Sequence, residues 1–369
     1  MMIVLYIFMG IFALFLLLVL LLIVLKKIND KKTEQDVLKF IVKNPDRASF
    51  YVMENGKILV NTGAEIKRPL ASVVKIMVLA EFAEQVSAGM IDVAEEVHLS
   101  SLNRFYIPKT DGGAHSKWLD NLKEQGLDLE AKCTLKEVAR GMILYSSNAN
   151  TEFLIEKLGL EAINHRIQEW GLEQHDLIYP LSSSMLIPSY LMDTLDLSKK
   201  QVAAYIADIS YSDYANKASE IFNLLQSDEE GKWIDQLNRQ ETSGLKLQEL
   251  WSAKLPGSTV QEYAHMLADI QEGKLLSEQA QPIFHELMEI KLKNPEPFIY
   301  VGQKGGSSIS IINQVIYSED MNGNKIQFAL FIHDPFGADR IWLNKKFDLF
   351  INKFFKDEPF KQQVVEALA

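Results

Sequence analysis

Strand-like segments lie near the two ends of this chain, and a long region of helical character separates them. Two of them, 48–53 and 57–61, are joined by Asn55-Gly56, a pair that favours a tight hairpin turn because both residues accept a positive φ. Three more strand-like segments follow towards the other end, at 298–303, 309–317 and 326–333. A single sheet that includes all of these strands must therefore be assembled from both ends of the sequence.

The region between the two groups of strands predicts a helical lobe, over about residues 72–296. We therefore expect an α+β fold, in which an antiparallel sheet with flanking helices packs against an all-helical lobe and a ligand cleft lies between them. A short helix is predicted over 33–46. A longer amphipathic helix is predicted over 339–356, with an inward face formed by Ile341, Phe347, Phe350, Ile351 and Phe354.

The first residues of the chain predict a membrane anchor. No charged side chain occurs between Met2 and Leu25. A helix of this length reaches about 36 Å, which exceeds the roughly 30 Å of a bilayer core. The segment has neither the basic start nor the small-residue cleavage site of a secretory signal peptide, so we expect it to be retained. The predicted organisation is an anchor at 1–25 in the lipid bilayer, a juxtamembrane linker and helix at 26–46, and a soluble domain at 47–369.

The composition excludes several classes of partner. Asp and Glu number 49 against 38 Lys and Arg, which gives a net charge of −11. Such a surface repels phosphate backbones, and no basic run is interleaved with aromatic residues, so no nucleic-acid partner is expected. Cys133 is the single cysteine, which excludes an internal disulfide and favours a packed small residue. The histidines lack metal-ligand spacing and no nucleotide-binding fingerprint occurs, so neither a metal nor a cofactor is predicted.

Ser72 and Lys75 form the first candidate catalytic pair. They begin an apolar helix after Pro69, and residues three apart share a helix face, so the hydroxyl and the amine can meet. A partly desolvated lysine beside a second cation can lose its proton near neutral pH and act as a base towards a serine. An S-x-x-K spacing is nevertheless common. Alone, it is more often a capping serine followed by a solvated lysine.

Two further polar segments accompany this pair. Ser146-Ser147-Asn148 lies where a helix that begins after Thr134 should end, and by itself it is more typical of a polar turn between helices. Lys304-Gly305-Gly306-Ser307 follows the strand 298–303. Its glycines allow a ligand backbone to approach closely, although an ordinary turn at a strand end has the same composition.

The three motifs occur in the order S-x-x-K, S-x-N and K-x-G, each in the expected helix, turn or strand context. On these residues the chain resembles the class A β-lactamase-like serine hydrolases of the penicillin-recognising superfamily, over about residues 47–356. The resemblance implies that Ser72 is the acylated nucleophile, Lys75 its general base and Ser146 the proton shuttle to the leaving group. It also implies an oxyanion hole made by the backbone N–H groups of Ser72 and Ser307, and substrate contacts from Asn148, Lys304, Gly306, Ser307 and, as an aromatic wall, Tyr106.

The sequence departs from that family at several points. Ser147 stands where the family usually has aspartate, and Gly305 where it has threonine or serine. An insertion-like stretch at 108–125 is expected to reshape the mouth of the cleft. The family also has a loop glutamate that activates water for deacylation, but 177–190 holds no carboxylate and is only flanked by Glu173 and Asp176.

These features predict a membrane-anchored serine hydrolase with slow deacylation. Its substrate would be a small molecule or a cell-wall peptide: a β-lactam, a D-Ala-D-Ala-like peptide or a related ester or amide. The alternative is a catalytically weak, penicillin-recognising binding or sensor protein that holds its ligand in the same cleft.

Two arguments conflict on the orientation of the anchor. Four lysines follow the apolar segment and favour a cytoplasmic position for the rest of the chain, namely Lys26, Lys27, Lys31 and Lys32. The substrates that the resemblance implies lie outside the cell, and long domains translocate largely regardless of flanking charge. We therefore expect a single-pass protein of the cell membrane, with its N-terminus inside and its catalytic domain extracytoplasmic.

Overall fold

The computed structural model describes residues 2–108, 110–127, 132–228, 232–237, 244–290, 297–334, 337 and 339–368. Residue contacts divide the chain into two compact units, one formed by Met1–Pro45 with Phe336–Leu368 and the other by Asp46–Pro335 with Ala369. The end predicted for the helical lobe, residue 296, lies outside the described residues.

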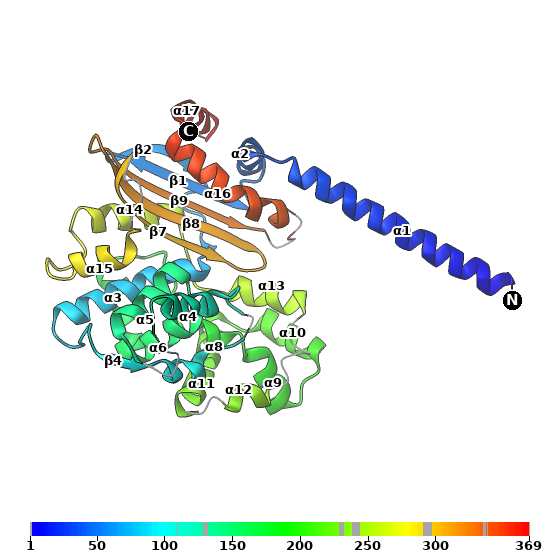
Figure 1. Cartoon of the computed structure of the whole chain (residues 1–369), viewed down its shortest axis with the longest axis horizontal. Coiled ribbons are helices and arrows are strands. Elements are labelled where there is room, and N and C mark those ends of the chain that lie inside the picture. Colours follow the sequence, from blue (N-terminus) through cyan, green and yellow to red (C-terminus); the bar gives the residue numbers. More distant parts are fainter. Residues whose placement is uncertain are drawn as a thin grey trace. The chain divides into compact units, whose positions relative to one another are not determined.

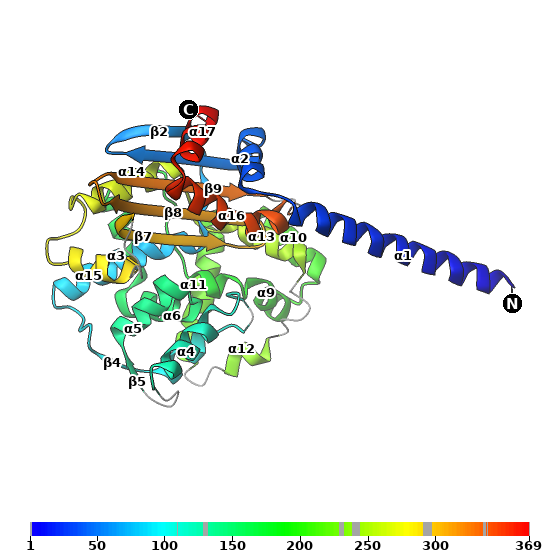
Figure 2. The same ribbon diagram turned by 45° about the horizontal axis from the view of Figure 1, so that its top comes forward.

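The larger unit contains a five-stranded antiparallel sheet made from both ends of its sequence, as predicted (Figure 1). Its strands are β1 (Ala48–Glu54), β2 (Lys57–Thr62), β7 (Phe298–Ser307), β8 (Ile311–Asp320) and β9 (Lys325–His333). They lie in the order β2-β1-β9-β8-β7, so β1 pairs with its hairpin neighbour on one side and with β9 on the other (Figure 2). Asn55 and Gly56 have φ values of 51° and 76°, which confirms the tight turn between β1 and β2.

Strand β7 is longer than the sequence suggests. The predicted strand ends at Gln303, but β7 continues to Ser307, with Gly305 paired to Gln314 and Gly306 to Asn313. Two consecutive glycines are typical of a turn, yet their backbone groups still join the ladder because β8 lies alongside. The third motif therefore lies on a sheet edge, since β7 is the last strand in the order, rather than in a loop.

The helical part of the larger unit begins with η1, a 3-10 turn at Ala71–Val74, and α3 (Lys75–Ser87). The elements that follow are β4 (Glu96–His98), η2 (Leu99–Phe105), α4 (Ala114–Glu124), β5 (Lys132–Thr134), α5 (Leu135–Arg140), η3 (Gly141–Tyr145), α6 (Asn148–Leu158), α7 (Leu160–Glu169), α8 (Leu181–Ser184), α9 (Ile187–Leu195), α10 (Lys199–Asp208), α11 (Tyr211–Ser227), α12 (Lys232–Gln236), α13 (Leu245–Lys254), α14 (Val260–Gln271) and α15 (Gln281–Met288). Two short strands complete it, β3 (Arg68–Pro69) and β6 (Gly257–Ser258). Cys133 is buried in β5, as expected for a packed small residue.

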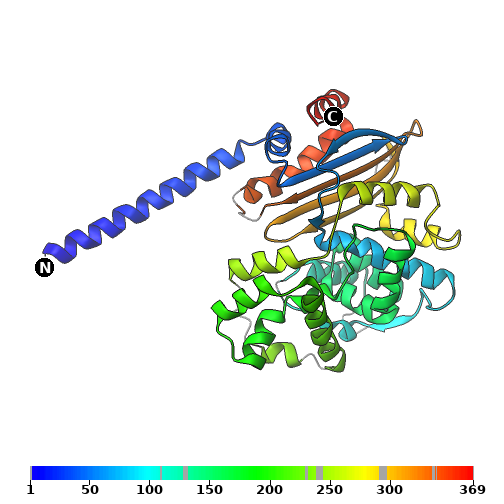
Figure 3. The same ribbon diagram turned by 180° about the vertical axis from the view of Figure 1, so that it is seen from behind.

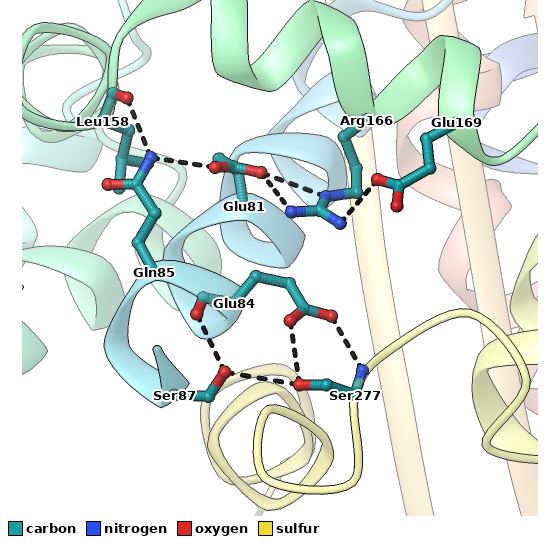
Figure 4. Close-up of polar contacts among 8 residues, drawn as sticks. All are labelled: Glu81, Glu84, Gln85, Ser87, Leu158, Arg166, Glu169 and Ser277. Atoms are coloured by element: carbon teal, nitrogen blue, oxygen red, sulfur yellow. Dashed lines mark hydrogen bonds and ion pairs between the residues drawn. The ribbon is translucent and has the colours of Figure 1, made fainter. Parts of the chain in front are cut away.

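Two helices connect this lobe with the sheet and the centre of the unit. Helix α14 packs on β1, β8 and β9 (Figure 3). The ring centroid of Tyr263 in α14 lies 5.8 Å from that of Phe331 in β9. Helix α3 is buried along almost its whole length, and its buried residues include the polar Lys75, Glu81 and Gln85. Its position is fixed by polar contacts far from its start: Glu81 pairs with Arg166 of α7, and Glu84 accepts from the backbone and side chain of Ser277 at 2.8 Å each (Figure 4).

The smaller unit consists of α1 (Met2–Asp30), α2 (Glu34–Lys43), α16 (Arg340–Lys356) and α17 (Glu358–Leu368). Helix α1 extends past the predicted end at residue 25, and its Met9–Asp30 part is long and apolar enough to cross a membrane, a property it shares with signal sequences. Within this unit, Lys345 pairs with Asp30 at 3.1 Å and Lys353 with Glu34 at 2.6 Å.

The prediction is wrong for one residue of the inward face of α16. Ile341 is 63% exposed, whereas the neighbouring Trp342 and Leu343 are buried. Six residues separate Ile341 from Phe347, which at 3.6 residues per turn places the two on different sides of the helix. Trp342 instead packs edge-on against Phe40, with 6.1 Å between the ring centroids.

Candidate active site

The structure brings the first two motifs together around the amine of Lys75. This residue is the first of α3 and is completely buried. Its Nζ donates to the carbonyl oxygen of Ser146 at 2.7 Å, to Oδ1 of Asn148 at 2.9 Å and to Oγ of Ser146 at 3.4 Å. The predicted polar turn therefore lies directly against the start of the predicted nucleophile helix.

Lys304 adds the third motif to the same cluster. Its side chain is 4% exposed, and its Nζ donates to Oγ of Ser146 at 3.0 Å and to the carbonyl oxygen of Gly305 at 3.1 Å. The hydroxyl oxygen of Ser146 thus accepts from both lysine amines. A serine in this position has its own proton left to donate.

The two buried amines favour the loss of a proton. Burial and the Lys304 charge lower the pKa of Lys75 well below its usual value, against smaller opposing effects of Asp111 and Glu152. Burial lowers the pKa of Lys304 to about 7. In the part of the chain that the structure describes, no carboxylate forms an ion pair with either lysine. A neutral amine at Lys75 can act as a base.

The backbone around Ser72 is held by the sheet. Ala71, just before it, has a φ of 50°, an uncommon conformation for a residue with a side chain. A Cβ atom on Gly306 would lie 2.3 Å from the carbonyl oxygen of Leu70, so only glycine lets β7 approach this turn. On the other side, Nδ2 of Asn313 in β8 donates to the carbonyl oxygens of Pro69 at 2.8 Å and Leu70 at 3.2 Å.

The sequence predicted that the Ser72 hydroxyl and the Lys75 amine meet on one helix face, but the structure shows no hydrogen bond between them. Ser72 is half-buried and lies in η1, a 3-10 turn, while α3 begins only at Lys75. The Lys75 amine is directed to Ser146 and Asn148, and Oγ of Ser72 has no hydrogen bond within the described ranges. The serine hydroxyl is therefore available to a substrate, and it lies three residues from the amine on the same chain segment.

The turn Ser146–Asn148 is strained and firmly held. It follows a single π-helical turn, and Ser146 has a φ of 68° in the left-handed region. Ser147 is fully buried, and its Oγ donates to Oδ1 of Asn150 at 2.6 Å. Ser147 therefore acts as a buried brace of the turn.

The stretch at 108–125 contributes to this brace through α4. Nδ1 of His115 lies 2.9 Å from Oγ of Ser147 and 3.2 Å from Oδ1 of Asn150. Tyr106 is half-buried and packs on His115, with 4.7 Å between the ring centroids. Ser307 is the exposed last residue of β7.

A carboxylate reaches the segment 177–190 from another element. Glu152 of α6 accepts from the backbone N–H of Ser182 at 2.7 Å and from Oγ of Ser183 at 2.8 Å. The flanking Asp176 is already engaged, since it pairs with Lys67 at 2.7 Å and accepts from the N–H of Gly257 at 2.9 Å.

Sequence reasoning missed three residues of this region: Asn313, His115 and Glu152. Each carries a weak signal. Asn313 is a polar residue within an apolar strand, and His115 shares a helix stripe with Trp118 and Leu122. Glu152 lies one helical turn after Asn148, on the same face of α6.

Comparisons with known proteins show which family and which solved structures the chain is similar to. A model of the β-lactamase enzyme family matches residues 32–340. The solved structure of PBP-A is similar, with a TM-score of 0.50 and 17% identity, over 88% of this chain and 95% of that chain. A β-lactamase from Sphaerobacter thermophilus DSM 20745 has a TM-score of 0.51 at 16% identity, over 83% of this chain and 92% of that one. A β-lactamase from Chitinophaga pinensis DSM 2588 also has 0.51, at 14% identity, over 84% and 96%. These structural similarities establish a shared fold. No curated protein matches the chain.

Proposed function

This chain belongs to the β-lactamase enzyme family, and from that premise we propose that Ser72 is acylated by a β-lactam, a D-Ala-D-Ala-like peptide or a related ester or amide. Membership makes the protein a β-lactamase-like serine hydrolase. The observation that carries the residue assignment is the position of Ser146 Oγ, which accepts hydrogen bonds from two buried lysine amines, Lys75 and Lys304.

In the proposed acylation, the neutral amine of Lys75 removes the proton of Ser72 as Oγ forms a bond to the substrate carbonyl carbon. The C–N or C–O bond of the substrate then breaks, and Ser146 donates a proton to the leaving atom. Ser146 regains a proton from the Lys75 ammonium, which returns that lysine to its neutral state. The lowered pKa of Lys75 and the contacts of Ser146 support this route.

The remaining predicted residues would hold the substrate. Asn148 would contact a substrate amide, and Lys304 with Ser307 would hold its carboxylate. Gly306 leaves room for a ligand backbone beside Ser72, and Tyr106 would form a wall of the cleft. The N–H groups of Ser72 and Ser307 would stabilise the oxyanion, which carries charge only in the transition state.

We also propose that hydrolysis of the acyl-enzyme is slow. The segment 177–190 has no carboxylate of its own to activate water. Both oxygens of Glu152, which reaches this segment, accept protein hydrogen bonds. This same observation supports the second candidate, a binding or sensor protein that keeps its ligand as a lasting adduct.

A label-and-chase experiment on the full chain in detergent micelles tests both candidates. Fluorescent penicillin should label the protein, and mass spectrometry should place the adduct on Ser72. Ser72→Ala should abolish labelling, and Ser100→Ala, at an exposed serine of η2, should not. Labelling at another residue would refute the assignment. After a chase with unlabelled penicillin, a burst followed by slow loss of the adduct supports a slow hydrolase, and a permanent adduct supports a sensor. Rapid turnover without a burst would contradict slow deacylation.

We propose further that α1 anchors the protein as a single-pass membrane helix, with the catalytic domain extracytoplasmic. The length and apolar character of α1 support a span, and the extracytoplasmic location of the proposed substrates supports the orientation. Protease added to intact cells should remove the domain and spare a cytosolic marker. Protection of the domain until lysis would reverse the orientation. Release of the domain without its first 30 residues would identify a cleaved signal sequence instead.

A further inference from the structure

Charge is distributed unevenly between the two units of this chain. The smaller unit, residues 1–45 with 336–368, contains 12 Lys and Arg against 8 Asp and Glu, which gives a net charge of +4. Because the whole chain has a net charge of −11, the larger unit carries −15. The smaller unit also contains α1, the apolar helix. A basic unit that is continuous with such a helix is complementary in charge to an anionic membrane surface.

Part of this positive charge lies at the end of the apolar segment of α1. Lys26 and Lys27 follow Leu25 directly, and both side chains are exposed. A helix rises 1.5 Å per residue, so Asp30, the last residue of α1, lies about 7 Å beyond Leu25. The polar interface of a bilayer is about 5–8 Å deep on each side of the hydrocarbon core. If α1 spans the membrane, its last residues therefore lie at the level of the lipid headgroups.

Helix α16 is held beside this end of α1. Nζ of Lys345 pairs with Oδ1 of Asp30 at 3.1 Å, and Nζ of Lys346 donates to the carbonyl oxygen of Asp30 at 3.4 Å. Just after α1, Nζ of Lys32 lies 4.8 Å from the ring centroid of Trp342, a cation–π contact. These contacts bring the first turns of α16, and two more lysines, to the level at which α1 leaves its apolar segment.

The exposed face of α16 carries apolar side chains beside these lysines. Ile341 is 63% exposed and Leu349 is 50% exposed. Each lies four residues from Lys345, so the three side chains form one stripe along the helix, while Trp342 and Phe347 on another side are buried. Single exposed apolar residues are common on proteins. Apolar residues that alternate with lysine at headgroup depth are typical of a helix that lies in the membrane interface.

We propose that the basic face, formed by Lys26, Lys27, Ile341, Lys345 and Lys346, docks on the headgroups of anionic phospholipids where α1 leaves the bilayer. This inference rests on the proposed anchoring by α1 and adds a second contact with the same membrane. The ammonium groups pair with lipid phosphates, and Ile341 enters the boundary between headgroups and acyl chains. A soluble anion would make no use of the exposed Ile341. The docking also gives the lysines after the apolar segment a role on either side of the membrane.

The full chain in lipid nanodiscs tests this docking. A fluorescent probe on Asn344→Cys, at an exposed residue of α16, reports contact with lipid through quenching by nitroxide groups on the lipid headgroups. The native Cys133 is buried, and the chain without the introduced cysteine measures any labelling of Cys133. We would compare discs of phosphatidylcholine with discs that also contain about 30% phosphatidylglycerol, an anionic lipid.

Quenching should be at least about threefold stronger in the anionic discs, and about 0.5 M salt should remove the difference because it screens the charges. Lys345→Gln with Lys346→Gln should reduce the difference by about half or more, whereas Lys345→Arg with Lys346→Arg should retain it, since arginine keeps the charge. Ile341→Ser should also reduce the quenching. Lys199→Gln with Lys200→Gln, at an adjacent exposed pair on α10, is the matched control and should have no effect.

Equal quenching in the two kinds of disc overturns the docking, and so does an unchanged difference in the variant with both Lys345→Gln and Lys346→Gln. A probe that is shielded from a water-soluble quencher but is not quenched by lipid also overturns it, because a second copy or another protein would then cover the face. Elution of the chain with the nanodiscs reports the anchor independently. A chain that elutes with the discs but shows equal quenching keeps the proposed anchor and refutes only the docking. A chain that does not elute with the discs refutes the anchor itself.

Discussion

Helix α3 carries two buried charged residues with opposite surroundings. Glu81 meets Arg166, whose Nε and Nη2 donate to it at 3.0 and 2.8 Å, and Gln85, which donates at 2.8 Å (Figure 4). Among the described residues, Lys75 meets only neutral oxygens as hydrogen-bond partners, and the positive charge of Lys304 opposes its own. Glu81 thus has an ion-pair partner, whereas the surroundings of Lys75 favour the loss of its proton. The difference separates a structural ion pair from a candidate catalytic group on the same helix.

The largest expected effect concerns Lys75, the candidate catalytic residue of α3. Lys75→Met removes the base but keeps a side chain of similar length, so acylation of Ser72 should slow by roughly 10²–10⁴. The melting temperature should hold or rise, because a buried amine without a counterion is replaced by an apolar group. Stopped-flow labelling and thermal unfolding measure the two effects. Acylation at the wild-type rate would show that the base lies elsewhere.

Substitution of Glu81, the residue of the structural ion pair, should have the opposite effect: a loss of stability with little change in acylation. Glu81→Ala removes the buried carboxylate that accepts from Nε and Nη2 of the partly buried Arg166, and it should lower the free energy of unfolding by about 1.5–3 kcal/mol. The acylation rate of the folded fraction should stay within about twofold, because the site geometry does not include Glu81. Glu169→Ala is the matched control: Glu169 also pairs with Arg166, but it is 52% exposed, so the loss should be about 0–1 kcal/mol. Equal losses in the two variants would remove the distinction between a buried pair and a surface pair.

The features of the fold and the site that could be predicted from the sequence are local ones. Alternating strands, the Asn55-Gly56 turn, the cap at Thr134 and the three motifs each depend on residues close together in the chain. Oγ of Thr134 accepts from the N–H of Glu137 as the motif predicts. The family resemblance places Lys75, Ser146, Asn148 and Lys304 in one site, and the structure brings these side chains together.

The features that the sequence did not predict depend on contacts between segments far apart in the chain. The continuation of β7 through Gly305 and Gly306 depends on pairing with β8, which local glycine content does not reveal. Arg166, Glu152 and His115 each lie in a helix with several other polar residues, and such residues are usually solvated. Only the packing of α7 on α3 and of α4 and α8 around α6 makes them partners of Glu81, Ser183 and Ser147.

A smaller expected effect is the pH dependence of stability that the buried Lys304 and Lys75 amines produce. The folded-state pKa of Lys304 is lowered to about 7, below its unfolded value of 10.5, so the folded protein binds fewer protons between these values. Stability should therefore increase from pH 7 towards pH 10.5, by up to about 1.4 kcal/mol per pH unit for one group. Lys75 should contribute in the same direction, since its pKa is also lowered. Chemical denaturation across this range should show a weaker increase in Lys304→Met than in the wild type, and an equal increase would place the Lys304 amine in water.

The smallest expected effect concerns the brace of the Ser146 turn. Because Ser147 Oγ–H donates to Asn150 Oδ1, the Nδ1 of His115 near both oxygens must carry a proton and donate. His115→Ala should cost about 1–2 kcal/mol in the free energy of unfolding, and less than tenfold in acylation, since Ser146 keeps its contacts with both lysines. Burial lowers the pKa of His115, so the imidazole stays neutral above pH 7. The decrease in the free energy of unfolding in His115→Ala should therefore be equal at pH 7 and pH 8. Lys117→Ala, at an exposed residue of α4, should change neither quantity. A His115→Ala loss that grows between pH 7 and pH 8 would mean that the imidazole titrates there, and the brace would then depend on its charge rather than on a neutral donor.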